Sequence, residues 1–161
     1  MAPATVEGPI LASAAGDPSH DYPSHIPFHY VMAAAIDHLV RWVKDGAPPP
    51  AAPRIDVKEV GPPAVISRDS HGNALGGIRL SQHEVATATN TGQNSGPGFC
   101  RLNGSYEAFD ISTLASLYPT HAGYVARVKE VTERNVRAGF ILKQDAEATV
   151  ADAERAQVGA R

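Results

Sequence analysis

Apolar residues recur at three- and four-residue steps in the segment PFHYVMAAAIDHLVRWVKDG, which spans residues 27–46. This spacing is typical of an α-helix with one apolar face, and the charged residues of the segment fall on the opposite side. Pro27 is tolerated only in a first turn, and Gly46 can take the left-handed conformation that closes a last turn. The pattern therefore predicts a helix over 27–46 with a face that must be buried. The apolar stripe consists of Phe28, Val31, Met32, Ala35, Leu39, Trp42 and Val43.

A period of two replaces the helical period after a stiff proline-rich spacer, as expected for half-buried strands. Between two short strands, Asp69 can accept hydrogen bonds from its own downstream backbone, while Gly72 and Asn73 tolerate positive φ. The sequence therefore predicts a hairpin with its tip at 69–73. Two consecutive glycines in the returning strand indicate a bulge or a close approach by another backbone. The predicted strands are 54–60, 64–67 and 75–79, and the two glycines are Gly76 and Gly77.

The segment 81–109 has neither period and includes TNTGQNSGPG, which offers almost nothing to bury. It is predicted to be a long surface loop, and such loops are usually functional or covered by a neighbouring element. Helical periodicity returns at Asp110. A short helix capped by Asp110 or Ser112 should end before Pro119, and a longer one should begin after Thr120 and stop at Gly139. A final helix over 143–158 has little to bury, so its end should fray.

Together these elements predict an α+β fold in one compact unit. It comprises one long amphipathic helix, a small antiparallel β-hairpin region and two to three C-terminal helices. The expected divisions are an irregular lead-in at 1–26 and a single unit at 27–158, the latter divided into a helix (27–46), strands with a hairpin (54–79), a loop (81–109) and helices (110–158).

Composition narrows the possible partners. Fourteen basic and 17 acidic residues give a formal net charge of -3 at pH 7, with no basic block, so nucleic acid is not an expected partner. The apolar runs fall short of the roughly 18 residues that a membrane-spanning helix requires, so no membrane partner is expected. The first 16 residues lack the basic start of a secretory signal, which favours a cytoplasmic location. No cofactor is predicted.

The densest titratable cluster lies in the lead-in. His20, His25 and His29 occur close to Asp17 and Asp21, and neutral imidazoles and carboxylates are ordinary zinc ligands. A proline between the second and third histidines prevents them from occupying successive turns of one helix, which argues against a metal site.

A second interpretation makes His20 a catalytic general base on a loop that leads into a helix, as in Ser-His-acid hydrolases. The nucleophile is harder to find. A nucleophile elbow reads G-x-S-x-G between a strand and a helix, whereas the nearest string, GQNSG, places Ser95 one position late. Cys100 is the only cysteine and has no histidine nearby in sequence, so an inert thiol is expected.

Several segments resemble the C-terminal part of a bacterial family of alpha/beta hydrolase domain proteins. These are PFHYVMAAAIDHLVRWVKDGAPPPAAPRIDV, ISRDSHGNALGGIRL, VATAT, GFCRLNGSYEAFD, LYPTHAGYV and AGFILKQDA. Members carry a catalytic-histidine motif similar to A-G-x-x-H-x-D, and AGDPSHD at 15–21 resembles it with one residue too many, which suggests a catalytic role for His20. The resemblance implies that helix 27–46 packs on the hydrolase sheet and that the nucleophile lies in a part this chain lacks.

Three interpretations follow. The chain is the C-terminal portion of an α/β-hydrolase-like esterase or amidase, incomplete and inactive alone; or a non-catalytic small-molecule-binding or self-assembling module; or a metal-dependent enzyme. The expected partners are a second copy of the chain or a missing N-terminal half, together with a small-molecule ester or amide.

Overall fold

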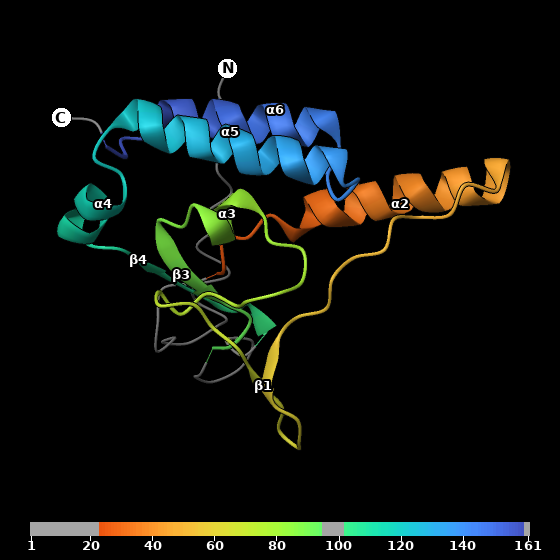
Figure 1. The fold of residues 1–161 in the computed structure, drawn as a ribbon, viewed down its shortest axis with the longest axis horizontal. Helices are drawn as coiled ribbons and strands as arrows, with labels where there is room; N and C mark the ends of the chain where they lie inside the picture. Colours follow the sequence, from red (N-terminus) through yellow and green to blue (C-terminus); the bar gives the residue numbers. More distant parts are fainter. Residues whose placement is uncertain (1–22, 95–101, 160–161) are drawn as a thin grey trace, which may run out of the picture.

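The computed structural model describes residues 23–94 and 102–159 as a mixed α+β fold with five helices and two antiparallel sheets of two strands each. Helices α5 (His121–Arg137) and α6 (Lys143–Arg155) lie side by side along one edge of the molecule (Figure 1). The short helix α3 (Ser81–Glu84) lies between this pair and the strands, and helix α2 (Phe28–Asp45) projects sideways beyond the pair (Figure 1). The predicted fold class is confirmed.

Helix α2 has the predicted bounds. Gly46 takes φ +70°, and its N–H donates to the carbonyl of Trp42, closing the last turn. The described chain does not cover the predicted apolar face, because Ala34 is the only buried residue of α2 among the described residues. The apolar stripe instead faces outward, with Phe28 69% and Val43 79% exposed. The physical reason is that no described element lies against the projecting part of the helix.

The first turn of α2 packs against the rest of the protein, unlike the projecting part of the helix. Tyr30 and Val31 pack against the small buried cluster of Leu80, Ile141 and Ala146. Further along, Nε2 of His38 lies 2.8 Å from the carbonyl oxygen of Gly139 in the α5–α6 connection.

The turn at 69–73 is confirmed, and its arms pair differently from the prediction. The N–H of Asp69 donates to the carbonyl of Asn73, and a single bridge joins Arg68 to Ala74. Beyond that bridge, the two arms of the turn pair with residues 55–59, which precede the turn, and not with each other. Strand β1 (Val57–Glu59) runs antiparallel to β2 (Val65–Ile66), and Ile55 forms a bridge with Gly76.

The two consecutive glycines allow the backbone approach that the sequence indicated. Gly76 and Gly77 have φ of +69° and +67°. A Cβ on Gly76 would lie 2.5 Å from the carbonyl oxygen of Arg54 and 2.6 Å from the backbone nitrogen of Asp56. Only glycine fits here, because side chains rarely adopt this φ and no space remains for a methyl group.

The expectation of a structureless loop at 81–109 is wrong. This segment contains α3 and a second hairpin, in which β3 (Ala88–Thr91) pairs antiparallel with β4 (Ser105–Ala108). Small and polar residues can form this ladder because a distant side chain supports it. Asn73, fully buried, donates from Nδ2 to the carbonyl of Ala88 and accepts from the N–H of Asn90.

Helices α4 (Ile111–Leu117) and α5 begin and end where their local sequence indicated. Helix α4 is capped by Asp110, and α5 is capped by the Thr120 hydroxyl, which accepts from the N–H of Gly123. At the end of α5, the N–H of Gly139 donates to Val136 and that of Phe140 donates to Asn135, the paired bonds of a Schellman motif.

Helix α6 ends at Arg155, three residues before the predicted end at 158. Ala156 and Val158 pack against the main core, and the carbonyl of Val158 lies 2.9 Å from Nδ1 of His121. The residues that follow α6 thus lie against the start of α5. The main core consists of Val85, Tyr118, Tyr124, Val128, Val131 and Ala153.

Candidate functional site

The residues proposed from sequence fall partly outside the described chain. His20, Asp17, Asp21, Ser95 and Cys100 belong to the segments 1–22 and 95–101, which the structure does not describe.

The two remaining histidines of that cluster make aromatic contacts. The ring of His25 stacks on Tyr106 with centroids 3.9 Å apart, and His29 meets Tyr30 edge to face at 4.4 Å. Within residues 23–94 and 102–159, no three His, Cys, Asp or Glu side chains are grouped so that they could hold a metal ion.

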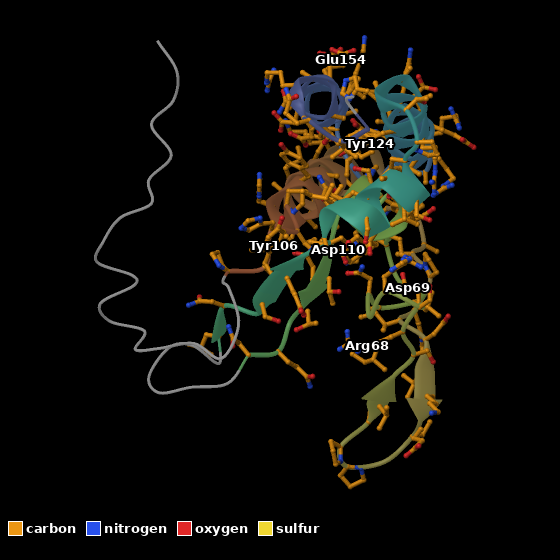
Figure 2. All side chains as sticks on the ribbon, turned by 90° about the vertical axis from the view of Figure 1, so that its left-hand side faces the viewer. Arg68, Asp69, Tyr106, Asp110, Tyr124 and Glu154 are labelled. Atoms are coloured by element: carbon orange, nitrogen blue, oxygen red, sulfur yellow. The ribbon has the colours of Figure 1, made fainter. Side chains whose placement is uncertain are left out.

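His25 leads instead to a cavity of about 250 Å³. The cavity lies where α3, the β3–β4 hairpin, α5 and α6 meet. Figure 2 shows Tyr106 on the hairpin side and Tyr124 on the helical side. The apolar residues that line the cavity include Val85, Val128, Ala153 and Ala156. The polar residues that line it include Ser81, Gln82, Asn90, Tyr106, Tyr124 and Asp152.

A chain of hydrogen bonds positions the polar wall of this cavity. The backbone N–H of Asn90 is held by Asn73 at 2.8 Å, so the side chain of Asn90 is fixed by the turn behind it. Its Oδ1 accepts from the backbone N–H of His25 at 2.9 Å and from the Ser24 hydroxyl at 3.4 Å. The Ser24 N–H also donates to the carbonyl of Asn103 at 3.0 Å. The segment that enters α2 is thereby attached to the hairpin.

Two buried residues of the cavity wall each have a polar group without a hydrogen-bond partner among the described residues. Asn90 is only 6% exposed, and its Nδ2 makes no such bond although its Oδ1 makes two. Tyr124 is 9% exposed, and its hydroxyl likewise makes none. Burial raises the pKa of Tyr124 above its ordinary value, and the nearby carboxylate of Asp152 raises that pKa further. The phenol is therefore neutral and able to donate at physiological pH.

The charge around the cavity is sparse. Asp152 is the only Asp, Glu, Lys or Arg among its lining residues. Asp152 is paired with Arg155 on the open surface, where both side chains are 70% exposed, so solvent screens its charge. The cavity thus offers a nearly neutral interior with hydrogen-bond donors.

The cavity lacks an activated nucleophile within the described chain. The Ser81 hydroxyl donates to Oε1 of Gln82 at 3.2 Å, and none of the described histidines is hydrogen-bonded to it. Acyl-transfer catalysis needs a base next to the hydroxyl and donors for the oxyanion. The arrangement is suited to binding.

A second polar cluster beside the cavity has a structural role. Nη2 of Arg79 donates to Oδ2 of Asp69 at 2.8 Å and to the carbonyl of His83 at 2.9 Å, which joins the turn to α3. Burial lowers the pKa of His83, and the adjacent Arg79 guanidinium lowers it further. A bond between Glu84 and Arg134, with N–O separation 2.5 Å, then ties α3 to α5.

The family can now be stated, because the matched range covers all of these elements except the end of α6. The chain matches the model of the Alpha/beta hydrolase domain family over residues 5–151. It belongs to that family. Searches of curated proteins and of solved structures found no match.

Membership of the Alpha/beta hydrolase domain family allows the described residues to be compared with the usual active-site arrangement of such hydrolases. In hydrolases of this kind the nucleophile stands on a sharp turn between a strand and a helix. Among residues 23–94 and 102–159, both sheets are antiparallel pairs and no strand leads into a helix through G-x-S-x-G. His20 lies within the matched range but outside the described residues. None of the described helices is long and apolar enough to cross a membrane.

Sequence reasoning missed the residues that form the cavity. Gln82, Asn90 and Tyr106 lie in the segment predicted to be a loop, and Tyr124 lies in the helix predicted to begin after Thr120. One signal was available: threonines alternate with smaller or polar residues at positions 87, 89 and 91, and this period of two with β-branched residues is typical of a strand.

Proposed function

We propose that the chain is the C-terminal portion of an α/β-hydrolase-like esterase or amidase, and that it requires a nucleophile-bearing portion for turnover. The observation that carries this proposal is the exposed apolar stripe of α2. Phe28, Leu39 and Val43 are more than half exposed, although their spacing is that of a buried helix face. In α/β folds such helices cover a largely parallel sheet, and a sheet of that kind would bury this stripe.

The lead-in to α2 supports the same proposal. His20 precedes the anchored residues Ser24 and His25 by only a few positions, and the family resemblance gives it the role of general base. A general base must be held within hydrogen-bond reach of its nucleophile. Anchoring the start of α2 to Asn90 would restrict where this base can lie. The cavity beside His25 would then accommodate part of an ester or amide substrate.

The chemistry of the isolated chain tests the proposal. Without an aligned nucleophile and oxyanion donors, a lone general base contributes only about 10²- to 10⁴-fold to a rate. Purified chain should therefore show no saturable turnover of p-nitrophenyl acetate beyond that of free imidazole. His20→Ala and Ser95→Ala variants should match the wild type. Saturable turnover that either substitution abolishes would place a complete active site in this chain and overturn the proposal.

A genetic observation completes the test. Reading the DNA upstream of Met1 should reveal a coding segment with G-x-S-x-G between a predicted strand and helix. Co-expression of that segment should give ester or amide hydrolysis that His20→Ala abolishes. Activity that persists in the variant would remove His20 from the mechanism.

A non-catalytic binding module is the second candidate function, and the cavity of about 250 Å³ favours it. Upstream DNA without a nucleophile elbow, together with ligand binding by the chain alone, would favour this alternative.

A further inference from the structure

We propose that the cavity between α3, the β3–β4 hairpin, α5 and α6 binds a small uncharged molecule with a carbonyl oxygen, such as a planar amide or ester. The inference concerns binding, and assigning this ligand to the substrate of a hydrolase rests on the function proposed above. Its starting point is Asn90, a nearly buried carboxamide whose acceptor end is occupied and whose donor end is not.

The orientation of Asn90 gives the site its polarity. Oδ1 is fixed by the His25 N–H at 2.9 Å, and the backbone of Asn90 is fixed by Asn73 at 2.8 Å. The amide therefore cannot reverse without losing its bond to His25, and its N–H groups remain available. These N–H groups have no partner among the described residues, and Asn90 lines the cavity, so a water or a bound ligand there can accept from them. A carbonyl oxygen is the matching acceptor.

The remaining walls define the rest of the ligand. Val85, Val128 and Ala153 are apolar, and the stacked rings of His25 and Tyr106 add a flat aromatic surface. A cavity of about 150 Å³ is enough for benzene. The observed volume of about 250 Å³ therefore admits a single ring carrying one small polar group.

Charge selects the neutral form of such a ligand. A carboxylate would lose its hydration without gaining a lysine or arginine, since neither lines the cavity. A cation has no lone pair for the Asn90 donor, and the Asp152 charge that could attract it is exposed and already paired with Arg155. An uncharged carbonyl compound avoids both penalties.

Three probes of nearly identical shape test this selection: benzamide, benzoate and benzamidinium, which carry charges of zero, minus one and plus one. Their binding to the ¹⁵N-labelled chain is measured by NMR titration at neutral pH, with the side-chain amide signal of Asn90 assigned by its loss in Asn90→Asp. Benzamide should bind with a dissociation constant on the order of 1 mM, as its size suggests, and shift that signal. Benzoate and benzamidinium should each bind about tenfold or more weakly.

Three variants locate the site. Asn90→Asp keeps the acceptor for His25 and removes the donor, so benzamide should bind about tenfold more weakly. Ala156→Leu fills part of the cavity without touching Asn90 and should weaken benzamide binding as well. Gln144→Glu makes the same amide-to-acid change as Asn90→Asp on an exposed turn of α6 and should leave binding unchanged.

Equal binding of the three probes, a preference for either ion, or benzamide binding that survives Ala156→Leu would overturn the proposal. If Asn90→Asp fails to fold, the order of affinity among the three probes and the Ala156→Leu variant still decide the matter. The readout is binding without turnover. A negative result here therefore leaves the proposed hydrolase function standing, and a failure of hydrolysis leaves this site standing.

Discussion

The side-chain oxygen of Asn73 accepts a hydrogen bond from the backbone N–H of Asn90, with an N–O distance of 2.8 Å, although the two residues belong to different hairpins. The nitrogen of the same side chain donates to the carbonyl of Ala88 at 3.1 Å. The buried side chain of Asn73 thus makes hydrogen bonds to β3 like those that the backbone of a neighbouring strand makes. Through Asn90 it also supports the start of α2, because Asn90 holds the N–H of His25.

Replacing Asn73 should destabilise the protein strongly. Asn73→Ala removes both bonds and leaves a buried N–H and a buried carbonyl without partners, which should cost about 2–4 kcal/mol of unfolding free energy. Urea denaturation followed by circular dichroism measures the change. Gln144→Ala, at an exposed position of α6, is the matched control and should change stability by less than about 0.5 kcal/mol. Equal midpoints for Asn73→Ala and wild type would contradict the bridging role.

Gly72 should tolerate no branched side chain. It has φ +80°, and a Cβ there would lie 3.0 Å from Cγ2 of Thr89. Gly72→Val should therefore lower the unfolding free energy by about 1 kcal/mol or more. Gly61 has open space around it and no positive φ, so Gly61→Val is the control and should have a small effect. A denaturation midpoint for Gly72→Val as high as that of the control would refute the turn geometry.

Asp110 should titrate at unusually low pH. Hydrogen bonds from the Ser112 hydroxyl and from the N–H and hydroxyl of Thr113 lower the pKa of its carboxyl from 3.8 to about 2. Because the folded pKa lies below the unfolded value, the cap contributes stability that is present above about pH 4 and lost as pH falls through about 2.

Carboxyl ¹³C NMR titration measures that pKa directly. Ser112→Ala removes the bond with the largest effect, so the pKa of Asp110 should rise back toward 3.8. The stability difference between wild type and Asp110→Ala should also shrink as the pH is lowered from about 4 to about 2. A titration midpoint at the ordinary value in the wild type would show that the cap does not form.

The exposed stripe of α2 should cause the isolated chain to associate with itself or with a partner. Contiguous apolar faces of this kind are uncommon on monomers, so light scattering at micromolar concentration should report a dimer or larger species. Leu39→Glu places a charge on the stripe, where the native side chain is 54% exposed, and should yield a monomer. Lys44→Glu places the same acidic side chain on the polar side of α2 and should leave the assembly intact. A clean wild-type monomer would mean that the stripe needs no protein cover.

The helix ends show how much local sequence can decide. Gly46, Asp110, Thr120 and Gly139 each act on backbone groups within about four residues of themselves, so their effects could be predicted from neighbouring positions. The turn at 69–73 was predictable for the same reason, because Asp69 accepts from the N–H groups of His71 and Asn73.

The cavity and the β3–β4 hairpin could not be predicted from local sequence, because contacts between distant segments form them. Asn90 and His25 are 65 positions apart, and the bond between them exists only after the lead-in and the hairpin are brought together. Strand β3 reads ATNT, which offers little apolar surface, so its pairing depends on support from Asn73 and from the partner strand. The apolar stripe of α2 indicated by itself that a face needs burial. Which surface buries it depends on contacts between distant segments or chains, which local spacing does not encode.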